Sequence, residues 1–177
     1  MISSTTAQLS RGWVETQLVQ YLGGITSILS RLASDIIMYP VPVPRFVSLR
    51  ADEANMRTGP GVRYPVDWVY QRAGLPLKVV GEHDTWRRVQ DHEGTRGWMH
   101  QSLLSGRRTA LVTTGSAVLR ADSQPEATPI ARFRRGLLVR LQSCPEGTRA
   151  CLVAAEGYDG WLDRGALWGL LPGESLD

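Results

Sequence analysis

NMRTGPGVRYPV, residues 55–66, centres on a Gly-Pro-Gly turn. Such a run turns tightly, because proline fixes φ near about −65° and glycine adopts backbone conformations that other residues avoid. Short segments rich in β-branched and aromatic residues lie on both sides of the turn, and further glycine-containing and polar turns separate them. This pattern, which continues from residue 46 to residue 99, is typical of an all-β unit with many short strands.

The same pattern returns about 63 residues later in the chain. The landmarks that align are 55–57 with 118–120, 72–75 with 134–137, 93–94 with 156–157, and Gly97-Trp98 with Gly160-Trp161. A repeat of this period usually means that each copy is a structural unit, and about six strands are enough to close a small barrel. The sequence therefore predicts two tandem β-barrels, over residues 46–106 and 107–171.

The first 40 residues have a different character. Apolar residues recur there at helical spacing: Val14, Leu18, Tyr21, Leu22, Ile25, Ile28, Leu29, Leu32 and Ile36. Two interpretations stay open for residues 1–40, an atypical export signal or an amphipathic accessory helix. Charged residues and a pair of glycines interrupt the run too often for a membrane span. The proline-rich residues 41–45 follow, and they predict an extended linker.

The charge of the chain gives no strong support for nucleic-acid binding. The formal net charge is +3, and Lys78 is the sole lysine among 20 basic residues. Residues 45–106 hold nine basic and seven acidic side chains, and residues 107–177 hold nine and eight. Because neither half has an excess of one sign, we expect no nucleic-acid partner.

The first repeat resembles the bacterial SH3 domain. Its signature N-x-R-x-G-P-G is present as Asn55, Arg57, Gly59, Pro60 and Gly61. The second repeat resembles the family more weakly, since residues 122–125 replace the Gly-Pro-Gly turn. The tandem arrangement, the cysteine pair and the ending LWGLLPGE, residues 167–174, resemble small exported SH3-domain proteins of alphaproteobacteria. The resemblance implies two SH3-like barrels, the second degenerate, and binding of cell-wall or peptide ligands without catalysis.

Within the signature, we expect Arg57 to staple the turn by donating to backbone carbonyls, since its guanidinium carries five donors. Ligand contact is assigned instead to the aromatic residues Tyr64 and Trp68, with Arg63 and Arg87 supplying charge for acidic groups. Trp98 and Val69 are expected to point inward.

Cys144 and Cys151 are the only cysteines. The repeat alignment places them on neighbouring strands that flank a hairpin, which favours a disulfide and an oxidising compartment such as the periplasm. Zinc binding needs four ligands, and no histidine lies near the pair in the sequence. A catalytic cysteine would need a histidine from the other repeat. Both alternatives rank below the disulfide.

Other chemistry is weakly represented. The spacing of the three histidines is not that of a metal site, and Asp91 and Glu93 in a hairpin turn are expected to be solvated. No nucleotide, metalloprotease or hydrolase motif occurs, so no cofactor and no catalytic residue is assigned. We therefore expect an exported, non-catalytic module that binds peptide, peptidoglycan or a protein partner. An accessory subunit of a cell-wall hydrolase, a small RNA-binding barrel protein and a purely structural pair of barrels are the alternatives.

Overall fold

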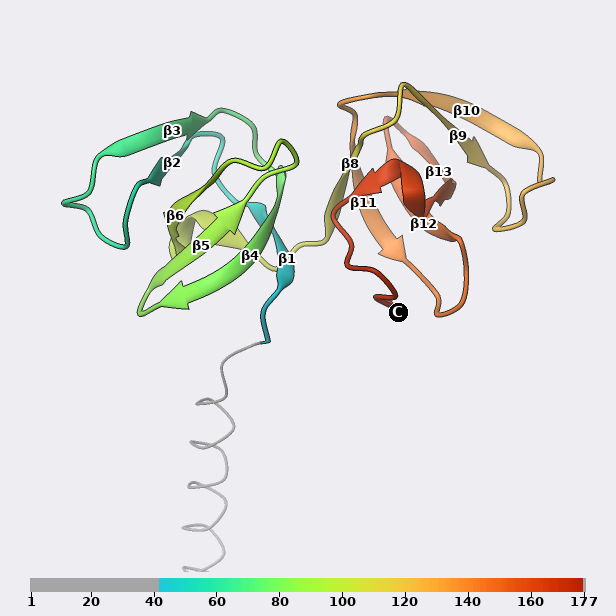
Figure 1. Ribbon diagram of the computed structural model, residues 1–177. Coiled ribbons are helices and arrows are strands. Elements are labelled where there is room, and N and C mark those ends of the chain that lie inside the picture. The colour runs from blue at the N-terminus through green and yellow to red at the C-terminus, as the bar shows by residue number, and fades with distance from the viewer. Residues whose placement is uncertain (1–41, 177) are drawn as a thin grey trace, which may run out of the picture. The chain divides into compact units, whose positions relative to one another are not determined.

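The computed structural model describes residues 42–176, so the predicted segment 1–40 lies outside the described residues. The first barrel, barrel 1, is an antiparallel sheet in the order β3-β2-β6-β5-β4-β1-β7 (Figure 1). Its strands are β1 (Arg45–Leu49), β2 (Ala54–Arg57), β3 (Val66–Tyr70), β4 (Pro76–His83), β5 (Trp86–Gln90), β6 (Arg96–His100) and β7 (Leu104–Ser105). The 3₁₀ turn η1 (Gln101–Leu103) joins β6 to β7.

Barrel 2 repeats this plan strand for strand, in the order β10-β9-β13-β12-β11-β8-β14. Its strands are β8 (Thr109–Val112), β9 (Ser116–Arg120), β10 (Pro129–Arg134), β11 (Leu138–Ser143), β12 (Ala150–Ala155), β13 (Tyr158–Asp163) and β14 (Leu167–Trp168). The 3₁₀ turn η2 (Arg164–Ala166) joins β13 to β14. No α-helix occurs in residues 42–176. The predicted all-β fold with two tandem barrels is therefore confirmed.

The repeated Gly-Trp pair marks the place where two strands come very close. A Cβ at Gly97 would lie 2.5 Å from Cγ of Met56 and 2.9 Å from the carbonyl oxygen of Arg57. At Gly160 the nearest atom would be the carbonyl oxygen of Arg120, at 2.7 Å. Only glycine leaves room for β6 to pack on β2, and for β13 to pack on β9, at these distances.

Each barrel has its own apolar core, formed by alternate residues of its strands. The core of barrel 1 includes Leu49, Met56, Leu77, Val79, Val89 and Met99. The core of barrel 2 includes Val112, Leu119, Val139, Cys144, Cys151, Val153 and Leu162.

Residues from barrel 2 also complete the core of barrel 1. Leu111 belongs to the buried cluster of barrel 1, and the indole of Trp168 meets the ring of Phe46 edge-on with 5.3 Å between ring centroids. The hydroxyl of Thr109 donates a hydrogen bond to the carbonyl of Gly74 over 2.7 Å. The barrels therefore share contacts, as the structural alternative expects, but this contact leaves other surfaces of barrel 1 open.

Candidate ligand-binding surfaces

The Gly-Pro-Gly loop between β2 and β3 is held by the signature residues themselves. Nη1 of Arg57 donates to the carbonyl oxygens of Tyr64 at 2.7 Å and Val62 at 3.2 Å. The ring of Tyr64 lies against Gly59, where a Cβ would be only 2.5 Å from the ring. Arg57 and Gly59 therefore shape the loop, and the staple expected of Arg57 is present.

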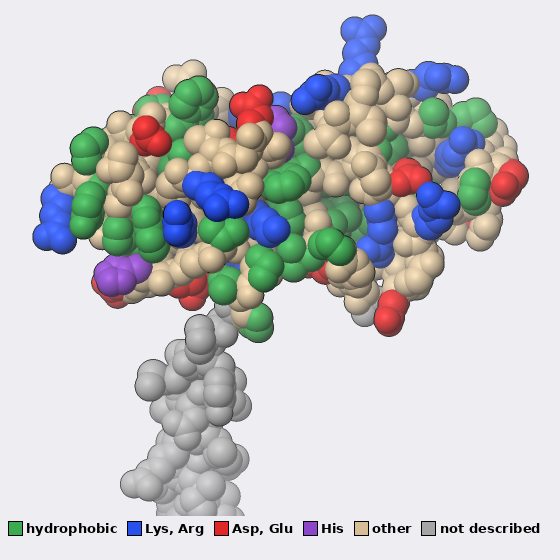
Figure 2. All heavy atoms as spheres, in the orientation of Figure 1, with side chains coloured by type: hydrophobic (Ala, Val, Ile, Leu, Met, Phe, Trp, Pro, Cys, Tyr) green, Lys and Arg blue, Asp and Glu red, His purple; other side chains and the backbone are tan. Residues whose placement is uncertain are grey.

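The outer end of this hairpin exposes apolar side chains. Trp68 is 53% exposed, Val66 42% and Val62 79%. The guanidinium carbon of Arg63 lies over the ring of Tyr64, 5.2 Å from its centroid. We call Val62, Arg63, Tyr64, Val66 and Trp68 the arm surface. Figure 2 shows hydrophobic side chains gathered over the β2–β3 end of barrel 1.

The arm surface combines three properties of a recognition site. It is aromatic, it carries a cation, and it stands on a hairpin whose loop is fixed by Arg57. The indole of Trp68 meets the ring of the buried Tyr70 edge-on, with 6.5 Å between centroids, which limits its freedom to move. Three of the four residues assigned to ligand contact, Tyr64, Trp68 and Arg63, therefore lie together.

Arg87 lies elsewhere, because β2 and β6 separate its strand from β3 in the sheet. Its Nε is 3.0 Å from the carboxylate of Glu82, and its Nη atoms donate to the Asp84 carbonyl and the Gln101 side chain, each at 2.7 Å. Its guanidinium is thus engaged within barrel 1, and we leave Arg87 out of the proposed binding surface.

Two side chains expected to point inward do not. Val69 is 42% exposed, because strand alternation places Tyr70 in the core and turns Val69 to the opposite face. Trp98 is only half-buried, since its neighbours Gly97 and Met99 take the inward positions. Its indole instead meets the ring of His83 edge-on, with centroids 6.4 Å apart.

Asp91 was expected to be solvated, and it is buried, with 5% exposure. Its carboxylate accepts hydrogen bonds from the backbone N–H groups of Glu93 and Thr95, at 3.0 and 2.8 Å, and from the hydroxyl of Tyr70 at 2.8 Å. These three donors replace water and allow the charge to be buried. Burial, and then the hydrogen bond to Asp91, raise the pKa of the Tyr70 hydroxyl. The turn is therefore organised from within and offers no solvated carboxylate pair for catalysis.

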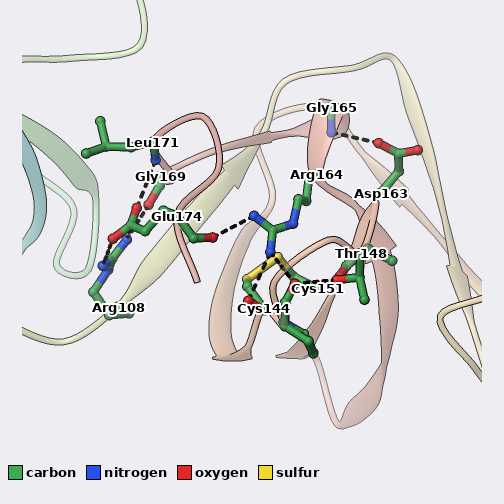
Figure 3. The surroundings of a disulfide bond; sticks show 12 residues. Arg108, Cys144, Thr148, Cys151, Asp163, Arg164, Gly165, Gly169, Leu171 and Glu174 are labelled. Carbon is green, nitrogen blue, oxygen red and sulfur yellow. Dashed lines mark hydrogen bonds and ion pairs between the residues drawn. A yellow bond between two sulfur atoms is a disulfide. The ribbon is translucent and has the colours of Figure 1, made fainter. Parts of the chain in front are cut away.

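The cysteines form the expected disulfide (Figure 3). Cys144 and Cys151 are both fully buried, with Cα atoms 4.3 Å apart. Because both sulfurs are in the S–S bond, neither is a thiolate nucleophile or a zinc ligand in this state. No group of three or more metal-ligating side chains occurs among residues 42–176.

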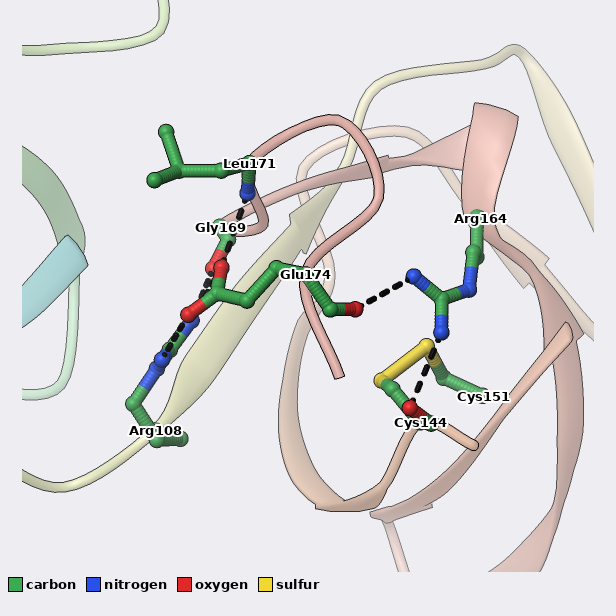
Figure 4. Close-up of polar contacts among 7 residues, drawn as sticks. All are labelled: Arg108, Cys144, Cys151, Arg164, Gly169, Leu171 and Glu174. Carbon is green, nitrogen blue, oxygen red and sulfur yellow. Dashed lines mark hydrogen bonds and ion pairs between the residues drawn. A yellow bond between two sulfur atoms is a disulfide. The ribbon is translucent and has the colours of Figure 1, made fainter. Parts of the chain in front are cut away.

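The segment after β14 lies beside the disulfide, and Arg164 links it to Cys144 (Figure 4). Nη2 of Arg164 donates to the Cys144 carbonyl at 2.9 Å, and Nη1 donates to the carbonyl of Glu174 at 2.6 Å. Arg108 holds the Glu174 carboxylate with both Nη atoms, and the N–H of Leu171 donates to the same group. Burial would raise the pKa of Glu174, but these hydrogen bonds and the charges of Arg108 and Arg164 outweigh it and hold that pKa below its usual value.

The comparisons with known proteins agree with this geometry. The sequence profile of the bacterial SH3 domain matches residues 50–106 and 114–169, one match for each barrel. The chain belongs to the bacterial SH3 domain family. The weaker second resemblance is thus a true second SH3 domain, although it lacks the Gly-Pro-Gly turn. A search among curated proteins finds no match.

Among solved structures, the chain is similar to NlpC2 and NlpC1 from Trichomonas vaginalis. The sequence identities are 12% and 11%, and the TM-scores are 0.33 and 0.32. The likeness covers 73% of this chain and 49% and 47% of those chains, so the SH3 domains described here span about half the length of either protein. Among the described residues, no helix has the length and apolar character needed to cross a membrane.

Proposed function

We propose that this protein is an exported, non-catalytic binding module that recognises a cell-wall peptide, peptidoglycan or a partner protein through the arm surface of barrel 1. Bacterial SH3 domains are generally binding modules, and both barrels belong to that family. The observation that carries the proposal is the exposure of Trp68, 53%, beside exposed valines and the cation of Arg63. Tryptophan and arginine are the residue types that most often dominate binding energy at interfaces.

Export is supported by the disulfide. Disulfides persist in oxidising compartments and are rare where thiol reductants are abundant. Cys144 and Cys151 are the only cysteines, and they are joined. The joined cysteines therefore support a location outside the cytosol, in the compartment that also holds the cell wall.

The direct test is retention of the full chain on purified peptidoglycan. We expect the unaltered protein to be retained and Trp68→Ala to lose at least about tenfold in affinity, the cost of removing a central aromatic contact. Tyr158→Ala is the matched control, because Tyr158 is 50% exposed but lies on barrel 2. If the Trp68 and Tyr158 variants behave alike, the arm surface is not the binding site.

A partner protein would use the same surface and is recognised in a separate experiment. Crosslinking in the intact envelope, with a photoreactive residue at position 68 and again at position 158, should give an adduct only from position 68. A hydrolase in that adduct would identify the chain as an accessory subunit. Equal adducts from both positions would remove the arm surface from the proposal.

One observation favours RNA as a second candidate ligand. Arg72, Arg132, Arg134 and Arg135 surround one hollow of about 360 Å³, with Glu156 as its only acidic lining residue. Four cations in one place attract a phosphate backbone even when the net charge is small. Binding to a single-stranded RNA oligonucleotide should then weaken steeply with salt, and a double change of Arg134 and Arg135 to Gln should reduce that slope. Absence of RNA binding, or a salt slope that the double variant leaves unchanged, would exclude this candidate.

A further inference from the structure

The strand register makes the two barrels comparable residue by residue. Arg57 pairs with Trp98 as Arg120 pairs with Trp161. Trp86 pairs with His100 as Ala150 pairs with Asp163. His100 and Asp163 are also equivalent as N-caps, since each side chain accepts a hydrogen bond from a backbone N–H at the start of the following 3₁₀ turn. Ala150 therefore occupies the position in barrel 2 that is equivalent to Trp86 in barrel 1.

This exchange opens a pocket in barrel 2. In barrel 1, the indole of Trp86 meets the ring of His100 edge-on, with centroids 5.5 Å apart, beside a hollow of about 280 Å³. In barrel 2 both rings are absent, and the corresponding hollow has about 450 Å³. The hollows are equivalent, because Arg57, Val62 and Leu103 line the first where Arg120, Pro125 and Ala166 line the second. A pocket of this size lies in the range that binds small ligands.

The lining combines charge of both signs with an aromatic surface. Arg120, Arg149, Asp122 and Asp163 contribute charges, and Trp161 is half-buried at the same pocket. Arg120 is occupied as Arg57 is, since its Nη1 donates to the Ala127 carbonyl at 2.8 Å. The backbone carbonyl of Arg149 accepts from the N–H of Arg164, but its side chain is exposed at the pocket, and the guanidinium has no hydrogen-bond or ion-pair partner among residues 42–176.

These groups fit a peptide end. A free guanidinium presents two parallel donors, which match the two oxygens of a carboxylate. One carboxylate oxygen of Asp163 accepts from the N–H of Gly165 at 2.7 Å, and the other side of the group is open to a ligand donor such as an amide. The indole of Trp161 provides an apolar surface for an aliphatic side chain.

We propose that the pocket of barrel 2 binds the C-terminal end of a short peptide, with its carboxylate on Arg149, an amide on Asp163 and an aliphatic side chain on Trp161. This site is separate from the arm surface of barrel 1. It stands whether or not that surface binds a ligand.

The test is an NMR titration of the full chain with the tripeptide alanyl-leucyl-alanine, as the free acid and as its C-terminal amide. We expect the free acid to shift the indole signal of Trp161 and the backbone signals around Arg149, and to bind at least about tenfold more tightly than the amide, because a charge-assisted pair is lost in the amide. Arg149→Gln should weaken binding of the free acid by a similar factor. Arg88→Gln is the matched control, because Arg88 is an exposed arginine of barrel 1 outside the arm surface, and this change should alter nothing at Trp161.

Ala150→Trp adds an independent readout, because it restores the side chain that stands at this position in barrel 1. We expect this variant to lose the titration shifts. Should it fail to fold, Arg149→Gln decides alone, since an exposed arginine is replaced without loss of packing. The proposal is overturned if the free acid gives no shifts at Trp161, if acid and amide bind equally, or if Arg149→Gln leaves the affinity unchanged.

Discussion

Reduction of the Cys144–Cys151 disulfide should destabilise barrel 2 by about 2.5 kcal/mol and leave barrel 1 unchanged. The two cysteines are seven residues apart, and closing a loop of about eight residues restricts the unfolded chain by this amount in the chain-entropy treatment. The folded geometry should persist after reduction, because Arg164 and the Cys144–Leu176 bridge hold the same segment. The effect then arises in the unfolded chain.

Barrel 1 offers a matched internal control at the same place in the sheet. The pair Glu82–Arg87 lies one residue beyond Gly81–Arg88, just as the cysteines lie one residue beyond Ser143–Leu152. An ion pair of 3.0 Å therefore links barrel 1 where a covalent bond links barrel 2. A partly exposed ion pair contributes up to about 1 kcal/mol and is screened by salt. High salt should weaken the barrel 1 link only, and a reductant should weaken the barrel 2 link only.

Hydrogen exchange read by mass spectrometry separates the two barrels within the full chain. Peptides from β11 and β12 should gain exchange on reduction, equivalent to the loss of about 2.5 kcal/mol, and peptides from β4 and β5 should not. The double variant Cys144→Ala, Cys151→Ala should reproduce the reduced state without reductant. If reduction is complete by mass and β12 exchange is unchanged, or if both barrels respond equally, the reasoning from loop closure is refuted.

Three further changes test the strand packing at Gly97 and the contacts of the titratable residues Glu174 and Tyr70. Gly97→Ala should cost about 2 kcal/mol in urea unfolding, because its Cβ would lie 2.5 and 2.9 Å from atoms of β2. Glu174 has a lowered pKa, so the stability that it contributes is present above its ordinary pKa of 4.5 and is lost as the pH falls. In a plot of unfolding free energy against pH, Glu174→Gln should therefore reduce the fall at acid pH. Tyr70 has a raised pKa, so the stability that it contributes is lost as the pH rises above 10.0, the ordinary pKa of a tyrosine. Tyr70→Phe should remove that loss at alkaline pH. At neutral pH the same change should cost about 1–3 kcal/mol, because Asp91 loses a hydrogen bond. The assigned contacts would be contradicted if Glu174→Gln left the fall in unfolding free energy at acid pH unchanged, or if Tyr70→Phe left the fall at alkaline pH unchanged.

The repeat made most of the fold predictable. Gly97-Trp98 and Gly160-Trp161 recur because each glycine allows two strands to approach closely, and such a backbone requirement is visible in one sequence. The disulfide was predictable for a similar reason, since the alignment placed both cysteines on adjacent strands. The candidate binding site was harder to predict from the sequence. Tyr64, Trp68 and Arg63 are close in the chain and lie together, whereas Arg87 had to be placed by the strand order.

The wrong prediction for Asp91 came from a partner that is distant in the sequence. Asp91 resembles a solvated turn residue, but the hydroxyl that allows its burial belongs to Tyr70, 21 residues earlier. Val69 faces outward, against the prediction, because Tyr70 takes the buried position of β3 and strand alternation turns Val69 to the opposite face. The sequence did not predict the pocket of barrel 2, because this pocket arises where a large side chain, equivalent to Trp86, is absent. The alignment of Trp86 with Ala150 was the available signal.

Ala150, which stands where barrel 1 has Trp86, is the chain neighbour of Cys151 of the disulfide. Replacing a buried tryptophan by alanine typically costs about 3–5 kcal/mol, and Trp86 is 9% exposed in barrel 1. Cys151 follows Ala150 directly, and its disulfide returns about 2.5 kcal/mol through the unfolded state. The ion pair of Arg108 with Glu174 adds a contact on the same barrel. The disulfide and this ion pair therefore reinforce a barrel that carries the open pocket and lacks the tryptophan packing found in barrel 1.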